Sequence, residues 1–184
     1  MNKLYMIIPI FALAGGLAYG NVGFTPVYQP SHSTYPYAQL SDTTTQSCPT
    51  ATPADVTIDT NDSIYKLTHP TSSHLITIQE SGVYQIIAVP QVGEETAQAN
   101  GEWKFWLLIN GTNVANTSIE EHVTPQVTIG ESSTATLNWI GHLNANSTVS
   151  FQQLCTSANI ALLTTAAATP PVTPSIIITI ARMS

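Results

Sequence analysis

Charged residues are scarce in this sequence. They make up 8% of its 184 residues, against roughly 25% in a typical soluble domain. The basic residues are Lys3, Lys66, Lys104 and Arg182, and the net charge is −7. Because neutralising phosphates requires clustered lysine and arginine, the sequence excludes nucleic-acid binding. Serine, threonine, asparagine and glutamine supply most of the polarity instead, which favours an extracellular or particle-surface protein over a cytosolic enzyme.

A catalytic constellation is also missing. The sequence contains neither a Gly-x-Ser-x-Gly nucleophile elbow nor a glycine-rich phosphate loop. Its histidines are spread along the chain without an evident acid–base partner, at His32, His69, His74, His122 and His142. We therefore predict that the protein is not an enzyme and that it uses no cofactor.

Two short acidic segments have the residue types of a cation site. Glu120, Glu121 and His122 are consecutive, and residues 59–62 contain two aspartates and an asparagine. Neither segment has the ligand spacing of a calcium-binding EF-hand loop. We predict a solvated turn at residues 120–122 and no metal-binding residues, with a bound cation at that turn as the alternative.

Long apolar runs are absent except at the N-terminus. Lys3 precedes an apolar run from Leu4 to Ala18, and Ala18 and Gly20 supply the small residues of a cleavage site. The run is short for a membrane-spanning helix, which needs about 20 residues. We predict that residues 1–20 are a secretion signal peptide. A retained anchor, which would be the chain's contact with a membrane, is the alternative.

Cysteine occurs twice, at Cys48 and Cys155. An exported chain permits a disulfide bond between them, which would tie the N-terminal part of the chain to the rest. Two free thiols are the alternative, and the sequence does not decide between them.

Proline, serine, threonine and tyrosine dominate residues 21–55, which show neither a helical nor an alternating period. No Gly-X-Y repeat occurs, so the segment is not a collagen stalk. We predict an extended arm stiffened by proline, with disorder as the alternative. Its aromatic residues can bury area against a neighbouring surface.

β-strand patterns fill residues 56–184. Short runs rich in β-branched and aromatic residues recur at spacings of about 8–12 residues, and Asn110-Gly111 is a strong hairpin signal. No amphipathic helix pattern interrupts them. The sequence therefore predicts an all-β domain, an antiparallel sandwich of eight to ten strands.

The order of three motifs in this domain resembles the TNF-like jelly-roll superfamily. These motifs are ESGVY at residues 80–84, LLING at residues 107–111 and LNANSTVSF at residues 143–151, and a final strand follows at the C-terminus. The superfamily includes the globular heads of the first complement component and the heads of bacterial spore-surface collagen-like proteins. The sequence departs from the family pattern at Asn146-Ser147, where a Gly-Asp pair is usual, and it lacks the aromatic-glycine pattern of many last strands.

The resemblance implies a homotrimer, because members of the superfamily pack three jelly rolls around a threefold axis. The aromatic residues Tyr84, Trp103, Phe105 and Phe151 are our candidates for the subunit interface. The alternative for each of them is a place in the interior of the sandwich.

Four Asn-x-Ser/Thr triplets fall at expected turns or strand ends, where a glycan can stand in water. The acceptor residues are Asn61, Asn110, Asn116 and Asn146. A chain so rich in asparagine, serine and threonine also produces such triplets by chance.

Three functions are compatible with these observations. The first is a non-enzymatic structural protein, secreted or displayed on a cell surface, filament or virion, in which the jelly-roll domain assembles with copies of itself. The second is a head that binds a receptor or a glycan, for which exposed Trp103, Trp106 and Trp139 would be stacking platforms. The third is a pilin-like filament subunit that donates its N-terminal arm as a strand to the next subunit.

Overall fold

Side-chain burial alternates along the strands of this protein. The computed structural model describes residues 34–96, 100–125, 130–165 and 172–184. In β7 (Gly82–Glu94), for example, Tyr84, Ile86 and Ala88 are buried, whereas the residues between them are half-buried. This period of two places successive side chains on opposite faces of a sheet. Within the described residues the structure contains fifteen strands and no helix, and all strand pairings are antiparallel.

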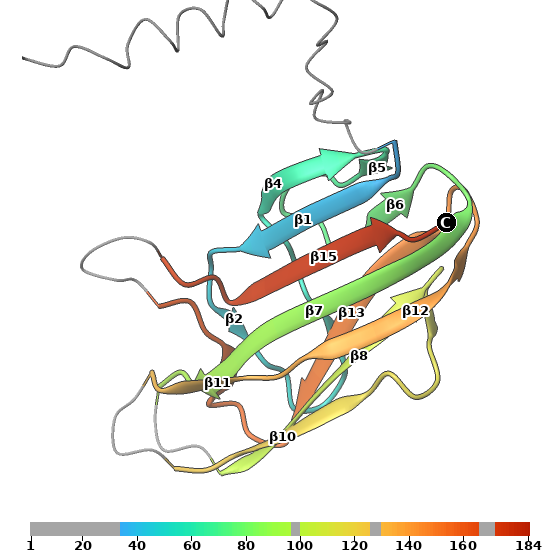
Figure 1. Ribbon diagram of the computed structural model, residues 1–184. Coiled ribbons are helices and arrows are strands. Elements are labelled where there is room, and N and C mark those ends of the chain that lie inside the picture. Colours follow the sequence, from blue (N-terminus) through green and yellow to red (C-terminus); the bar gives the residue numbers. More distant parts are fainter. Residues whose placement is uncertain (1–33, 97–99, 126–129, 166–171) are drawn as a thin grey trace, which may run out of the picture. The chain divides into compact units, whose positions relative to one another are not determined.

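The larger sheet faces the viewer in Figure 1 and has eight strands. Their order is β2-β14-β7-β15-β1-β4, and β11 and β12 also pair with β7. Besides β7, its strands are β1 (Tyr37–Asp42), β2 (Gln46–Ser47), β4 (Thr60–Tyr65), β11 (Ser132–Thr134), β12 (Leu137–Leu143), β14 (Ile160–Leu162) and β15 (Ile176–Arg182).

The second sheet has seven strands and lies behind the first in Figure 1. Its order is β10-β8-β13-β6-β5, with β3 paired to β13 and β9 paired to β8. Its strands are β3 (Ala54–Asp55), β5 (Leu67–Thr68), β6 (Ile76–Ile78), β8 (Gly101–Ile109), β9 (Thr112–Asn113), β10 (Ile119–Val123) and β13 (Thr148–Cys155). Eight of the fifteen strands have five or more residues. The predicted antiparallel β-sandwich is confirmed.

The core fills the space between the two sheets with large aliphatic and aromatic side chains. Phe105 stacks between Trp103 and Phe151, with ring centroids 5.5 and 5.2 Å apart. All three rings are fully buried. Facing sheets pack about 10 Å apart, and inward-pointing residues of both sheets must fill that gap.

A disulfide bond joins the two sheets. Cys48 directly follows β2 of the larger sheet, and Cys155 ends β13 of the smaller one. Their sulfur atoms are 2.09 Å apart, and both residues are buried. The backbone of each cysteine is also hydrogen-bonded. Cys48 N–H donates to the carbonyl of Ile160, and Cys155 N–H donates to the carbonyl of Pro49. The bond closes a sequence separation of 107 residues.

The domain begins earlier than the sequence indicated. We expected an extended arm over residues 21–55 and a jelly-roll domain over residues 56–184, but the compact unit runs from Tyr35 to Ser184. We call this unit the head. Strand β1 lies between β15 and β4, with buried Ala38 and Leu40 facing the core. The predicted boundary at residue 56 is therefore wrong, and the part of the arm before residue 34 lies outside the described residues.

The hairpin predicted at Asn110-Gly111 is confirmed. It connects β8 to β9, where Ile109 pairs with Thr112. Both turn residues have positive φ values, 52° for Asn110 and 71° for Gly111. A two-residue turn of this kind matches the twist of the flanking strands.

Among the described residues, no helix is long and apolar enough to span a membrane. The signal peptide or anchor predicted for residues 1–20 lies outside them.

Candidate association face

The aromatic residues proposed as subunit contacts are core residues. Tyr84, Trp103, Phe105 and Phe151 each have a relative exposure of 0% within a single chain. Each of them occupies an inward position of its strand, where the sandwich requires large side chains. A second chain cannot reach them, so their assignment to a subunit interface was wrong.

A different set of apolar residues points outward from the larger sheet. Val83, Ile87 and Val89 alternate with the buried positions of β7, and they are half-buried. Ile177 of β15 pairs with Val89, and Ile140 of β12 pairs with Gln85, between Val83 and Ile87 on the outward side of β7. Ile140 is 59% exposed and Ile177 is 37% exposed. We call these five residues the association face.

The residues around the association face include no acidic side chain, lysine or arginine. The remaining outward positions of β7, β12 and β15, within residues 83–89, 138–142 and 177–181, are held by Gln85, Asn138, His142, Thr179 and Ala181. None of them is Asp, Glu, Lys or Arg. Removing amides and hydroxyls from water is less unfavourable than removing charges. The face therefore combines exposed apolar area with polar groups that a second protein surface can cover.

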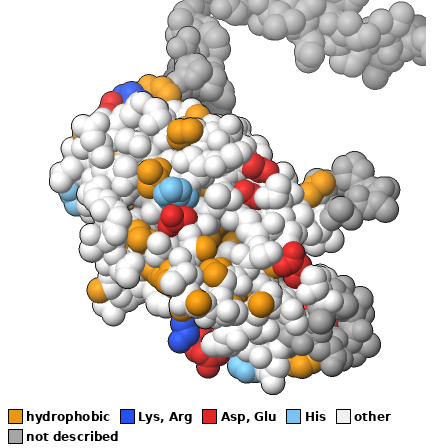
Figure 2. Space-filling view, turned by 180° about the vertical axis from the view of Figure 1, so that it is seen from behind, with side chains coloured by type: hydrophobic (Ala, Val, Ile, Leu, Met, Phe, Trp, Pro, Cys, Tyr) orange, Lys and Arg blue, Asp and Glu red, His pale blue; other side chains and the backbone are white. Residues whose placement is uncertain are grey.

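The opposite face of the sandwich is different. It carries ion pairs, with Lys104 Nζ at 3.2 Å from Glu120 and 3.7 Å from Glu102, and the His74 ring nitrogen Nε2 lies 3.5 Å from Asp55. Figure 2 views the molecule from this side and shows apolar side chains interspersed with charged ones. Scattered apolar residues are normal on a protein surface. This contrast between the two faces makes the larger sheet the stronger candidate for association.

The sequence contained a signal for the association face that we did not use. The run GVYQIIAVP at residues 82–90 is apolar on both faces of its strand, and SIIITI at residues 175–180 continues the same pattern. Near-continuous apolar strands are typical of sheets covered on both sides. A strand with one solvated face would alternate more strictly.

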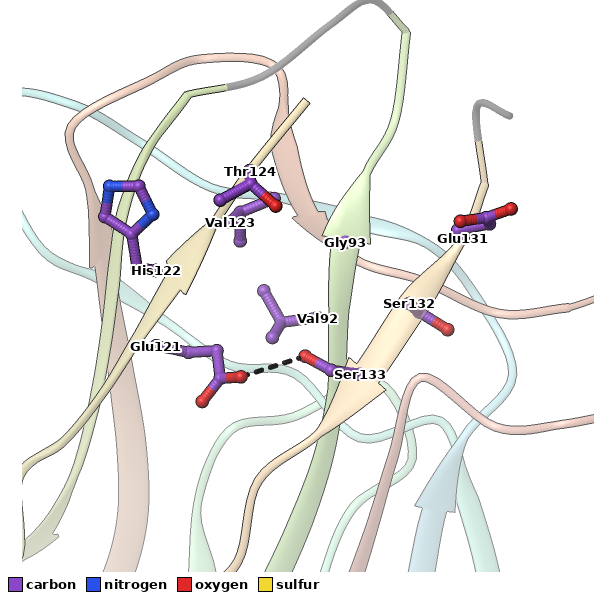
Figure 3. Close-up of a pocket in the computed structure, with 9 residues that line it drawn as sticks. All are labelled: Val92, Gly93, Glu121, His122, Val123, Thr124, Glu131, Ser132 and Ser133. Atoms are coloured by element: carbon purple, nitrogen blue, oxygen red, sulfur yellow. Dashed lines mark hydrogen bonds between the residues drawn. The ribbon is translucent and has the colours of Figure 1, made fainter. Parts of the chain in front are cut away.

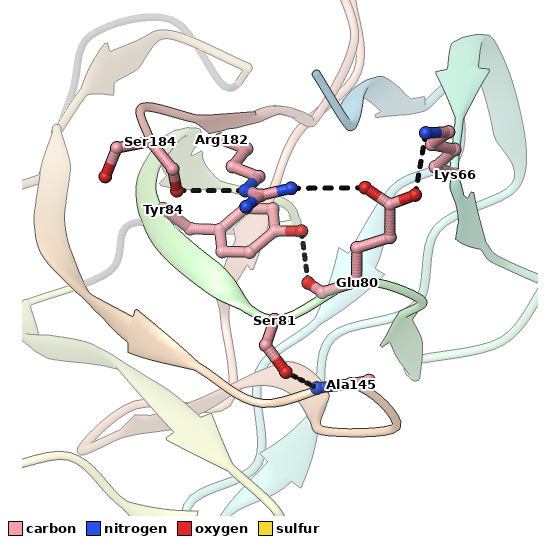
Figure 4. Close-up of polar contacts among 7 residues, drawn as sticks. All are labelled: Lys66, Glu80, Ser81, Tyr84, Ala145, Arg182 and Ser184. Carbon is pink, nitrogen blue, oxygen red and sulfur yellow. Dashed lines mark hydrogen bonds and ion pairs between the residues drawn. The ribbon is translucent and has the colours of Figure 1, made fainter. Parts of the chain in front are cut away.

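A cluster of polar contacts fixes the corner between β6 and β7 (Figure 4). The Tyr84 hydroxyl donates to the carbonyl of Glu80 at 2.7 Å. The Glu80 carboxylate accepts Lys66 Nζ at 2.6 Å and Arg182 Nη1 at 3.1 Å. Arg182 Nε also donates to the carbonyl of Ser184 at 2.9 Å. This corner therefore holds the last strand of the head against the start of β7.

The Glu80 carboxylate is stabilised in its charged form. The hydrogen bond from Lys66, together with the positive charges of Lys66 and Arg182, lowers the pKa of Glu80 below its ordinary value of 4.5, against the opposing effect of desolvation. The hydrogen bond with Glu80 in turn raises the pKa of Lys66. A carboxyl group whose pKa is lowered by folding contributes stability above its unfolded pKa, and that contribution is lost as the pH falls through the folded value.

We expect Glu80→Gln to reduce the sensitivity of the head to acid. The wild type should lose thermal stability between about pH 6 and about pH 3, and part of that loss should be missing in the variant because its side chain does not titrate. Thermal melts at several pH values measure this. Glu131→Gln is the control and should keep the wild-type acid loss. An equal loss in wild type and Glu80→Gln would contradict the role given to Glu80.

The acidic segment predicted as a solvated turn is part of strand β10. Lys104 pairs with Glu120, and Glu121 accepts a hydrogen bond from the Ser133 hydroxyl at 3.3 Å. Glu121 and Ser133 both line a pocket of about 200 Å³. Figure 3 shows Glu121 and Ser133 facing each other, with His122 and Glu131 turned away from them. Glu120, Glu121 and His122 point to alternate faces of β10 because they are consecutive residues of a strand. The prediction of a turn at residues 120–122 was therefore wrong. Among the described residues, no group of three or more His, Cys, Asp or Glu side chains is placed to hold a metal ion.

The four glycosylation acceptors are exposed, and none belongs to the association face. Asn61 is engaged with buried His69, because its Nδ2 donates to the His69 carbonyl and its Oδ1 lies 2.7 Å from His69 Nδ1. Asn110 Oδ1 accepts the Thr148 N–H at 2.8 Å. Asn116 and Asn146 have positive φ values of 62° and 66°. Glycosylation of any of these residues stays a prediction.

The tryptophans do not form an exposed stacking platform in the head. Trp103 is fully buried and donates its indole N–H to Gln153 at 3.1 Å. Trp106 and Trp139 are half-buried and lie on strands of different sheets. A glycan-binding head that uses an exposed tryptophan pair is not supported by this arrangement.

The architecture defines a jelly roll of the TNF-like and complement-head type. The globular domain of zebrafish complement 1qA protein matches with a TM-score of 0.50 and 10% sequence identity, over 81% of this chain and 98% of that chain. Murine APRIL matches with a TM-score of 0.50 and 6% identity, over 81% of this chain and 99% of that one. No protein-family model and no curated protein matches the sequence. At this identity the likeness concerns the fold, and the link to spore-surface heads stays a prediction.

Proposed function

We propose that this protein is a non-enzymatic structural or surface protein whose head forms a homotrimer through the association face. The outer face of β7, β12 and β15 carries this proposal, because it presents exposed apolar side chains and holds no Asp, Glu, Lys or Arg within residues 83–89, 138–142 and 177–181. Interfaces between subunits are depleted of charged residues at their centre. The opposite sheet, with its ion pairs, remains in contact with solvent in such an assembly.

The fold supports three copies rather than two. The superfamily that the sequence resembles packs its heads around a threefold axis. A sheet face that met an identical face across a twofold axis would give a dimer instead. The two arrangements differ in molar mass, so solution measurements separate them.

Export to an oxidising environment fits the same proposal. The buried disulfide is typical of proteins that fold outside the cytosol. The predicted signal at residues 1–20 and the low charge of the sequence agree with secretion or display on a cell, filament or virion surface. The arm before the head would then connect it to the rest of an assembly.

Ile177→Lys, alone or with Ile140→Lys, should dissociate the trimer. A lysine within the interface would bury an unpaired charge, and we expect assembly to weaken by about 100-fold or more. Leu75→Lys is a matched control, because Leu75 lies on the side of the smaller sheet and has the same exposure of 37% as Ile177. Light scattering after size exclusion reports the molar mass of each variant. A wild-type mass for Ile177→Lys, or dissociation by Leu75→Lys as well, would contradict the assignment.

A further inference from the structure

Three exposed tyrosines gather at one corner of the larger sheet. Tyr35, Tyr37 and Tyr65 are 51%, 36% and 40% exposed. Tyr37 and Tyr65 are directly opposite each other on β1 and β4, and their ring centroids are 6.0 Å apart. We call these three residues the tyrosine cluster.

Cations border the tyrosine cluster. Lys66 Nζ lies 5.4 Å from the centre of the Tyr65 ring, and the Arg182 guanidinium lies 5.9 Å from that of Tyr35. Both cations also bind Glu80, which holds them in place. Rings fixed in this way offer an aromatic surface with little conformational freedom left to lose on binding.

The tyrosine cluster continues the association face and marks the point where the chain enters the head. Tyr37 pairs with Ala181 of β15, which in turn pairs with Gln85 of β7. Arg182 N–H donates to the carbonyl of Pro36 at 2.9 Å. In an assembly built on the association face, the cluster of one copy therefore lies beside the neighbouring copy, and that copy's arm starts at the corresponding corner.

The arm has a composition that suits an aromatic surface. Residues 24–30 read FTPVYQP, with prolines at two positions four residues apart and two aromatic residues. Proline-rich segments favour the extended polyproline conformation and dock into aromatic-lined grooves. Between Asn21 and Thr34 the arm contains no lysine or arginine, so it carries no permanent positive charge that the cations at the cluster would repel.

We propose that residues 24–30 of one copy dock on the tyrosine cluster of a neighbouring copy. This inference rests on the proposed self-association of the head, which places a second arm within reach. In the extended conformation predicted for the arm, residues 24–34 would span about 34 Å at 3.1 Å per residue. The sequence of residues 24–34 contains two prolines and no glycine, and an arm of this stiff composition suits docking on a neighbour better than docking on its own head.

A disulfide-trapping experiment on the full chain tests the inference. Gln29→Cys places a thiol in the arm, and Ser63→Cys places one beside the cluster, since Ser63 pairs with Gln39 on the strand that carries Tyr37. Mild oxidation followed by non-reducing electrophoresis should give covalently linked oligomers in the double variant. Neither single variant should give the same product. Adding Tyr37→Ser and Tyr65→Ser should lower its yield by about fivefold or more.

Each other outcome overturns the proposal. A link within one chain would show that the arm docks on its own head. No link, or a yield that is independent of the tyrosines, would show that the arm does not use the cluster. The molar mass of the head without its arm, residues 35–184, is measured separately. If that head is trimeric and no link forms, the arm inference fails while the proposed trimer stands.

Discussion

Replacing Cys48 and Cys155 together with alanine is expected to lower the free energy of unfolding of the head by about 3 to 4 kcal/mol. This change should be among the largest that any substitution produces. The bond closes 107 residues of sequence, and cross-linking a loop of that length restricts the unfolded chain strongly. It also joins the two sheets directly, at a point where the neighbouring backbone is already hydrogen-bonded.

Denaturant titration of the wild type and the double alanine variant measures the change. Alanine keeps both positions small and apolar, so the comparison isolates the loss of the cross-link as far as a substitution can. Reducing the wild type should move its midpoint toward that of the variant. Equal midpoints for oxidised and reduced wild type would contradict a stabilising disulfide.

Phe105→Ala is expected to cost about 4 kcal/mol, because it removes the middle ring of the Trp103–Phe105–Phe151 stack and leaves a cavity. Both flanking rings lose a stacking partner, and the surrounding β-sandwich can collapse only in part. Phe105→Leu fills more of the space and should cost considerably less. If the alanine variant does not fold, the leucine variant still gives a measurable change.

The same variants separate a core role from an interface role. Phe105→Leu should lower the denaturation midpoint and leave the molar mass of the assembled protein unchanged. Trp106→Ala is the matched control on the same strand, because Trp106 points to the opposite face and is half-buried. It should cost much less than Phe105→Ala. A change in molar mass with wild-type stability would mean that Phe105 is a subunit contact after all.

The sequence predicted the fold class because its strands carry strong local signals. The Asn110-Gly111 turn, the ESGVY corner and the alternating pattern of β8 and β13 all depend on neighbouring residues, and the structure contains each of them. At Asn146, where the family usually has a Gly-Asp pair, the backbone adopts a φ of 66°. Asparagine tolerates that conformation, which explains why the turn forms without the usual Gly-Asp pair.

Strand β1 escaped prediction because its signal is weak and its surroundings are misleading. The stretch YAQLSD has only two buried apolar residues, Ala38 and Leu40, and the flanking residues have the composition of a linker. Its place in the sheet is decided by β15, which is far away in sequence. Strand β10 was missed for a related reason, since Glu120 and Glu121 have low β propensity and are stabilised by partners such as Lys104 and Ser133.

The roles of the aromatic residues could not be read from the sequence. Periodicity shows that Trp103 and Phe105 share a face, and it does not show which face is covered by the second sheet and which by another chain. The association face depends on the pairing of β7 with both β12 and β15, which brings Ile140 and Ile177 beside Val83, Ile87 and Val89. Pairing over such distances is a property of the folded chain.

Strand β15 also bears on the pilin-like alternative. It lies between β7 and β1 and supplies Ile176, Ile178 and Ile180 to the core. In a subunit that needs a donated strand, one strand position within the sheet is empty, and another chain fills it. Because the head closes that position with its own last strand, self-association of complete heads is the better-supported assembly.

The molar mass of residues 35–184 in solution tests the central claim most directly. Light scattering after size exclusion should give three times the mass of one head, with no contribution from the arm. A mass of one head would contradict the proposed assembly, and a mass of two heads would replace the trimer with a face-to-face dimer. If only the longer chain, residues 21–184, assembled, and did so into open-ended polymers, the protein would be a filament subunit and the association face would not be its interface.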